Sequence, residues 1–213
     1  MKKKITRSKL SYIAIMLVPI ILFSLYYITN QKTMNDVNVQ HSDTKNFIDD
    51  IPGEFIPIYQ AAGERYDVPW TLLAAHHRVE TRFSKMEVMV SPAGAIGPMQ
   101  FMPCTFVGWQ HPTCGDLGRG EISDQELTDP EVIDQYGGYG VDANADGKAD
   151  PWDVEDAIFS AAKYLSLHGV KEGNVEKAVF QYNHSEEYVE TVLYYLEKYE
   201  KDLKEESVST SME

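Results

Sequence analysis

The sequence is poor in positive charge, and much of what it has lies in one place. It has only 19 Lys and Arg residues against 33 Asp and Glu, and five of the 19 fall within the first nine residues. The other 14 leave the rest of the chain with a net charge of about −19. Such a field repels nucleic-acid phosphates, and no basic patch with interleaved aromatic residues offsets it. A nucleic-acid partner is therefore not expected.

Cysteine is also scarce, since the chain has only Cys104 and Cys114. Two cysteines alone make no strong zinc site. Outside the cytoplasm, a pair at this spacing can close a loop as a disulfide, which contributes roughly 2–3 kcal/mol if the geometry fits. The alternative is a pair of free, buried thiols.

One long apolar run, residues 10–28, stands near the start of the chain. As a helix it would rise about 28 Å, close to the hydrocarbon thickness of about 30 Å. All five early basic residues precede it, which predicts a cytoplasmic tail at 1–9 and an extracytoplasmic location for the remainder. A cleaved signal peptide, giving a secreted protein, is the alternative, but the run is long and lacks small residues at a cleavage site. We expect one transmembrane anchor; no cysteine follows it that could carry a lipid.

Beyond the anchor, residues 29–50 are polar and lack apolar periodicity, as is typical of a linker. From Ile51 onward, apolar residues recur at steps of three and four, which predicts a mainly α-helical domain over 51–202. The expected helices cover residues 55–66, 69–82, 154–165, 175–182 and 188–199. Asp67 is expected to cap the second of these, ahead of Pro69 in its first turn.

The middle of the domain, residues 91–140, is rich in Gly and Pro and predicts a loop-rich flank with short helices at most. No segment carries a convincing β-hairpin signal. The final residues, 203–213, are charged and rich in Ser, so we expect a disordered tail.

Glu80 is the first candidate for catalysis. A single glutamate on a helix is usually a solvated surface residue. Apolar neighbours such as Leu73, Val79 and Phe83 would partly desolvate this one, which raises a carboxyl pKa, and a glycosidic acid must keep its proton near neutral pH.

Downstream, residues 91–103 read SPAGAIGPMQFMP. Gly94 and Gly97 remove side chains where a bulky substrate could approach the backbone. Gln100 offers a donor and an acceptor to sugar hydroxyl groups. This suits a saccharide groove, although a Gly-rich loop packed on a core would look similar.

Three ordered segments together resemble the lytic transglycosylases: Glu80-Thr81-Arg82-Phe83, the run SPAGAIGPMQ at 91–100, and Tyr182-Asn183. The likeness covers about residues 51–199, and the residues of its motifs are most similar to those of the membrane-bound B-type branch. The resemblance implies a fold related to goose-type lysozyme. It also implies non-hydrolytic cleavage of the MurNAc-β-1,4-GlcNAc bond of peptidoglycan, leaving 1,6-anhydroMurNAc ends, without a catalytic cofactor.

By the same resemblance, Glu80 protonates the leaving oxygen and then acts as the base. The implied substrate-binding residues are Ser91, Met99, Gln100, Phe101, Tyr182 and Asn183. Glu87, the nearest other acid along the chain, belongs to no signature and is expected to be structural, and His76 and His77 are expected to be packed or partly exposed. Two alternatives stay open: a hydrolytic muramidase of the same fold, and a non-catalytic wall-binding or scaffold protein.

Residues 142–153 follow the pattern of an EF-hand loop, with Gly147 at the turn position. The oxygen ligands would be the side chains of Asp142, Asn144, Asp146, Asp150 and Asp153 and the carbonyl of Lys148. The last position departs from the pattern, since Glu is usual there, and Glu155 or Asp156 could serve instead. We expect structural calcium; an acidic turn without metal is the alternative.

Overall fold

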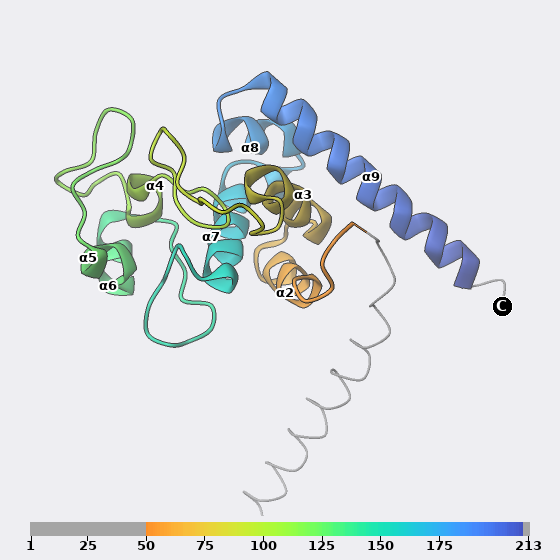
Figure 1. Cartoon of the computed structure of the whole chain (residues 1–213), viewed down its shortest axis with the longest axis horizontal. Coiled ribbons are helices and arrows are strands. Elements are labelled where there is room, and N and C mark those ends of the chain that lie inside the picture. Colours follow the sequence, from red (N-terminus) through yellow and green to blue (C-terminus); the bar gives the residue numbers. More distant parts are fainter. Residues whose placement is uncertain (1–49, 211–213) are drawn as a thin grey trace, which may run out of the picture. The chain divides into compact units, whose positions relative to one another are not determined.

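The computed structural model describes residues 50–210, drawn in colour in Figure 1. This part of the chain is helical and contains no strand, only isolated bridges near Ile96. The helical body consists of α2 (Ile56–Tyr66), α3 (Trp70–Thr81), α7 (Val154–Leu167), the 3-10 helix η2 (Val170–Glu172), α8 (Val175–Tyr182) and α9 (Glu186–Thr210). The flank carries three short helices, α4 (Pro103–Val107), α5 (Asp124–Thr128) and α6 (Pro130–Tyr136). The expected mainly α domain with a loop-rich flank is confirmed.

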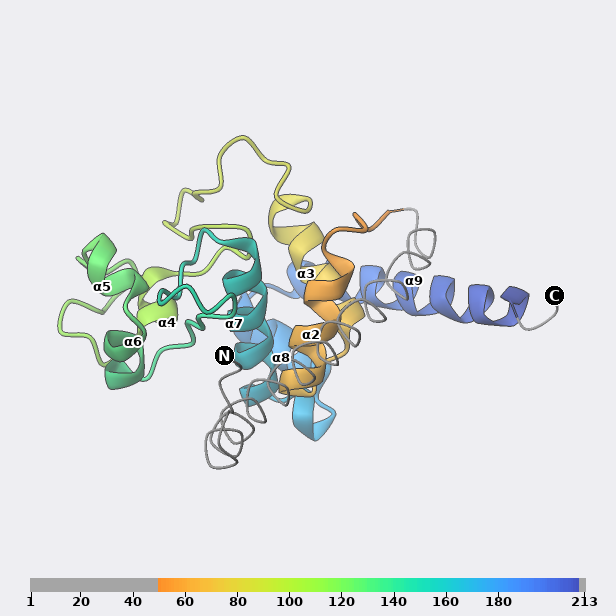
Figure 2. The same cartoon turned by 90° about the horizontal axis from the view of Figure 1, so that it is seen from below.

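Helix α3 is the centre of the domain. It packs against α2, α7 and α9, and its residues from Thr71 to His77 are all buried. Ala74 and Ala75 are fully buried, and their small side chains let neighbouring helices approach closely. In Figure 2, α4, α5 and α6 lie together at one end, and α9 extends from the opposite end.

The disulfide left open by the sequence is present in the flank. Cys104 in α4 is bonded to Cys114, with their Cα atoms 5.7 Å apart. The bond ties the start of the flank to the loop that leads toward α5.

The expected cap at the start of α3 is wrong. Asp67 instead ends α2, in the left-handed conformation with φ 56° and ψ 50°, and Pro69 precedes α3 without any side-chain cap. Aspartate tolerates this conformation better than most residues, so a signal for starting one helix served to stop the previous one.

The expected disordered tail is also wrong for residues 203–210, which continue α9. Charged pairs one turn apart support this extension: Lys198 with Asp202 at 3.2 Å and Lys201 with Glu205 at 3.6 Å. Lys198 Nζ also forms an ion pair with Asp50 Oδ2 at 2.8 Å, which connects α9 to the start of the domain.

The predicted anchor at 10–28 lies outside the described residues, as does the linker up to residue 49. Within the described range, no helix combines the length and the apolar character that crossing a membrane requires.

Candidate active site

Glu80 occupies the last turn of α3, where its side chain is only partly buried. Tyr188, in the first turns of α9, donates its hydroxyl hydrogen to Glu80 Oε1 at 2.5 Å. Burial raises the pKa of Glu80 to about 7, and the hydrogen bond from Tyr188 acts in the opposite direction. Near neutral pH, Glu80 can therefore both give and take a proton.

Behind Tyr188 lies His76, one turn before Glu80 on α3. Its Nδ1 atom is 2.9 Å from the hydroxyl oxygen of Tyr188. Because Tyr188 gives its only proton to Glu80, it must accept one from His76, which fixes the proton of this histidine on Nδ1. Burial lowers the pKa of His76 to about 3, so the ring is neutral.

The two histidines are packed, as expected, but they differ in what they touch. His77 forms two hydrogen bonds, one between Nδ1 and the Tyr59 hydroxyl at 2.7 Å and one between Nε2 and the Ser84 hydroxyl at 2.8 Å. His76 is linked to the candidate acid. Sequence reasoning missed this His76–Tyr188–Glu80 chain, because Tyr188 was visible only as one apolar position of a helix.

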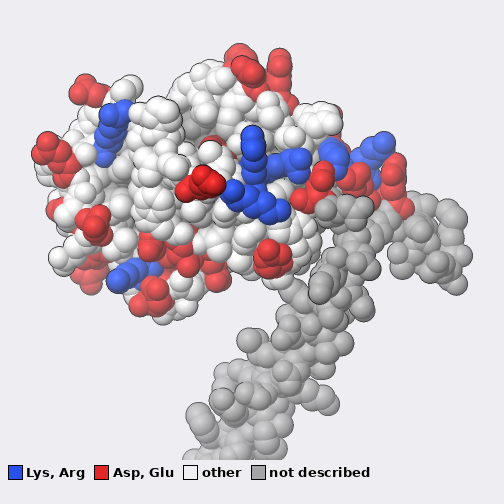
Figure 3. Space-filling view, viewed as in Figure 1, with Lys and Arg blue, Asp and Glu red and all other residues white. Residues whose placement is uncertain are grey.

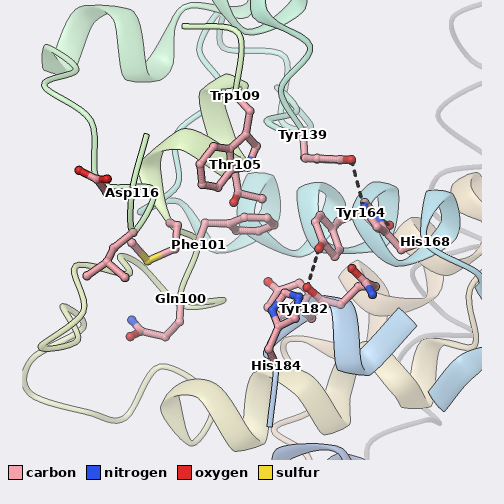
Figure 4. A pocket seen from close by; sticks show the side chains of 13 residues that line it. Gln100, Phe101, Thr105, Trp109, Asp116, Tyr139, Tyr164, His168, Tyr182 and His184 are labelled. Carbon is pink, nitrogen blue, oxygen red and sulfur yellow. Dashed lines mark hydrogen bonds between the residues drawn. The ribbon is translucent and has the colours of Figure 1, made fainter. Parts of the chain in front are cut away.

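A cavity of about 390 Å³ lies beside the candidate acid, between the flank and the helical body (Figure 4). Its lining residues are Gln100, Phe101, Met102, Thr105, Trp109, Asp116, Leu117, Tyr139, Tyr164, His168, Gln181, Tyr182 and His184. Many of these present aromatic rings, which suit the apolar faces of sugar rings. Asp116 is the only carboxylate among them.

Tyr182 joins this cavity to Glu80. Its hydroxyl donates to the carbonyl oxygen of Met99 at 2.8 Å. Burial, and then the nearby charge of Glu80, raise the pKa of Tyr182 well above its usual range. Glu80 itself does not line the cavity, and Tyr182 is the lining residue whose pKa its charge raises.

The predicted substrate-binding residues fall into two groups. Gln100, Phe101 and Tyr182 line the cavity. Gln100 uses both hydrogens of its amide on the carbonyls of Met89 and Gly97, at 3.1 and 2.9 Å, which leaves its oxygen for a ligand.

The other three do not line it. Met99 is fully buried beneath it, and the hydroxyl of Ser91 closes its own turn by accepting from the backbone N–H of Ala95 at 2.9 Å. Asn183 is exposed beside the cavity.

The glycines of the 91–103 loop serve packing rather than substrate approach. A Cβ on Gly97 would lie 1.9 Å from the carbonyl oxygen of Pro151, and one on Gly94 would lie 3.0 Å from the side chain of Arg119. Thr81 Oγ1, adjacent to Glu80, donates to Pro98 O at 2.7 Å. The loop is therefore fixed between the end of α3 and the segment before α7.

The acidic loop at 142–153 is closed by hydrogen bonds from backbone to side chain. Asp142 accepts from the N–H groups of Asp146 and Gly147, at 3.1 and 3.0 Å. Asp153 caps α7 by accepting from the N–H of residues 155 and 156. Asn144 and Asp146 each accept a backbone N–H inside the loop, and Asp150 accepts from Trp152.

Asp156 is the residue that organises this loop, although it lies outside the EF-hand pattern. It is fully buried and accepts from the N–H groups of Ala143, Asn144 and Asp150, at 2.8, 3.4 and 2.8 Å. Among residues 50–210, no three His, Cys, Asp or Glu side chains converge as a metal-binding cluster. The carboxylates of this loop accept hydrogen bonds from backbone N–H groups.

Comparison with known protein families identifies the family of this chain. Two family models, both described as a transglycosylase SLT domain, match residues 57–133 and 134–177. Together they span more than half of the chain. The chain therefore belongs to the SLT-domain transglycosylases, and its described part is their lysozyme-like domain. The family indicates lytic transglycosylase activity on peptidoglycan.

The two matches do not distinguish the B-type branch. No curated protein and no solved structure matches the chain. The first two of the three segments that carry the resemblance lie inside the matched range, and Tyr182-Asn183 lies just after it.

Proposed function

We propose that this protein cleaves the MurNAc-β-1,4-GlcNAc bond of peptidoglycan without water and leaves 1,6-anhydroMurNAc ends. The observation that carries the proposal is Glu80, a partly buried carboxyl with a pKa raised to about 7 beside an aromatic-lined cavity. A group titrating there is suited to act first as a general acid and then as a general base.

The absence of a neighbouring acid supports the non-hydrolytic route. Ordinary glycosidases use two carboxyl groups, about 5–5.5 Å apart when one is the nucleophile. A second carboxylate that close would itself raise the pKa of Glu80 by repulsion. Among the described residues, no second carboxylate contributes to the pKa of Glu80, which is raised by burial.

The steps follow from one carboxyl group. Glu80 gives its proton to the glycosidic oxygen as the bond from that oxygen to the anomeric carbon breaks. The 6-hydroxyl of the same muramic acid then forms a bond to the anomeric carbon, and its proton returns to Glu80. The acid is regenerated, and the products together have the mass of the substrate.

Mass spectrometry of digested peptidoglycan tests the reaction, since an anhydro end lacks the one water that a hydrolysed end has. Anhydro products support the proposal, and hydrated ends would identify a muramidase instead. Glu80→Gln keeps the shape and removes the proton donor, so soluble products should disappear. Glu87→Gln is the matched control and should retain activity. If purified wild-type protein bound peptidoglycan but released nothing, the non-catalytic alternative would hold.

Two further proposals rest on the sequence pattern. The segment 10–28 is proposed to anchor the chain in the membrane, with the catalytic domain on the cell-wall side. Membrane fractions should then hold full-length protein whose domain is open to external protease, and a form shortened by about 25 residues would favour a cleaved signal. The loop at 142–153 is proposed to bind structural calcium, with the lone pairs left on its carboxylate oxygens.

A further inference from the structure

A second cavity, of about 520 Å³, lies between the end of α3 and α9. The residues that line it are Asp50, Arg78, Val79, Arg82, Phe83, Lys85, Thr191 and Tyr195. Val79 precedes Glu80 in the chain, and Arg82 follows two residues after it. The cavity is therefore lined by residues on both sides of the candidate acid in the chain, although Glu80 itself does not line it, and its lining shares no residue with the aromatic cavity that contains Tyr182.

This cavity gathers cations in a domain that is otherwise strongly acidic. Figure 3 shows a group of Lys and Arg side chains near the end of α3, while Asp and Glu are spread over much of the same face. Arg82 and Lys85 are exposed, and no carboxylate among residues 50–210 lies within 4.0 Å of either. Arg78 lies 4.3 Å from the centre of the Tyr195 ring and 3.6 Å from Asp50, the carboxylate of the lining, which Lys198 also pairs at 2.8 Å. Arg82 and Lys85 are therefore the cations of the lining that remain for a ligand.

The backbone holds these cations in an unusual position. Arg82, Phe83 and Ser84 have φ values of 53°, 61° and 60°, so three consecutive residues other than glycine are left-handed. This conformation is unfavourable for each of them and persists only where the surroundings impose it. Here Phe83 is buried, and the hydroxyl of Ser84 is hydrogen-bonded to His77 Nε2 at 2.8 Å. The result is an exposed arginine two residues after the acid.

We infer that this basic cavity binds the carboxylates of the stem peptide that peptidoglycan carries on its muramic acid. This inference rests on the proposed function. The sugar rings of the glycan are uncharged, whereas the stem peptides bear free carboxylates, and a guanidinium group binds a carboxylate through two parallel hydrogen bonds. A glycan seated over Glu80 would bring a stem peptide within reach of cations only two and five residues further along the chain.

The test compares two substrates stripped of other wall polymers: glycan strands that carry stem peptides, and the same strands after an amidase has removed them, which leaves only the lactyl carboxylate on each muramic acid. Binding is measured on the Glu80→Gln chain, where cleavage does not interfere, and KM on the wild-type chain. The variant is Arg82→Asn with Lys85→Gln, because asparagine tolerates a positive φ. Lys171→Gln, an exposed lysine of η2 that lines neither cavity, is the matched control.

With Arg82 and Lys85 in place, the Glu80→Gln chain should bind peptide-bearing strands about tenfold more tightly than bare ones, as two exposed ion pairs allow. The double variant should lose that preference and leave the binding of bare strands and kcat unchanged, and the control should keep it. A wild-type chain with no preference, or a variant that weakens both substrates equally, would overturn the inference. If the preference is present but neither substrate is cut, the proposed reaction fails while the binding site stands.

Discussion

Replacing Tyr188 with Phe tests how the protein sets the pKa of its acid. The ring would still fill its place, so the burial that raises the pKa of Glu80 should remain, but the 2.5 Å hydrogen bond to Oε1 would be lost. That bond favours the charged carboxylate, so its removal should raise the pKa further. A hydrogen bond to a charged group contributes about 1.5–3 kcal/mol, and 1.36 kcal/mol corresponds to one pKa unit. We therefore expect a shift of about 1–2 units, from about 7 to between about 8 and 9.

The assay is the rate of muropeptide release between about pH 5 and 10. In the proposed reaction Glu80 must be protonated at the start, so the rate should fall as pH rises through its pKa. In Tyr188→Phe this alkaline decline should move upward by about one unit or more. Tyr194→Phe, an exposed position on the same helix, is the control and should leave the profile unchanged.

The same substitution has a second consequence at His76. Its Nδ1–H would lose its partner in a fully buried site, which should lower the free energy of unfolding by about 1–3 kcal/mol. A stability loss without a pH shift would mean that Tyr188 is only structural. An alkaline decline that stayed in place or moved downward would refute the reasoning about Glu80.

Three further predictions concern stability. Since the folded pKa of Glu80 is above its ordinary value of 4.5, the folded state binds more protons than the unfolded state between about pH 4.5 and 7, and stability should fall as pH rises through that window. Relative to wild type, Glu80→Gln should thus raise the free energy of unfolding by about 1–3 kcal/mol more at pH 8 than at pH 4.5, and an equal effect at both would contradict this. Gly97→Ala should cost more than about 2 kcal/mol, because its φ is +76° and the new Cβ would meet a backbone carbonyl; Gly53→Ala, where a Cβ has open space, should cost little in the same denaturant titration. Calcium at a hundredfold excess over Kd should stabilise the chain by about 2.7 kcal/mol, with a smaller effect of magnesium. Asp142→Ala with Asp146→Ala should abolish that stabilisation, and identical melting curves in calcium and chelator would leave an acidic turn without metal.

The main helices could be predicted because burial on one face leaves a periodic trace in the sequence. The pattern at 175–182 coincides with α8, and that at 154–165 ends two residues short of α7. The short helices of the flank left signals that were not used: Ser123 and Glu126 form a capping box at α5, and Asp129 caps α6 ahead of Pro130. Local chemistry would have found them.

The candidate site was predictable only in part. The motif led to Glu80 and to half of the implied substrate-binding residues at the cavity. The partner of Glu80 was not accessible, because Tyr188 lies 108 residues away in the chain and meets it only through the packing of α9 on α3. A periodic pattern identifies the buried face of a helix, but it does not identify which polar atom on that face meets which partner.

The features that sequence rules described worst gather around Glu80. Its carboxyl is desolvated, the three residues from Arg82 to Ser84 are left-handed, and within the described residues His76 Nε2 is buried without a partner. Each of these lowers stability, so a domain shaped for stability alone would avoid them. The rest of the domain offsets these costs through a central helix packed on several sides and a disulfide across the flank. Such a concentration of unfavourable features is what a site for proton transfer requires, since an acid that keeps its proton near pH 7 must be held where its charge is poorly solvated.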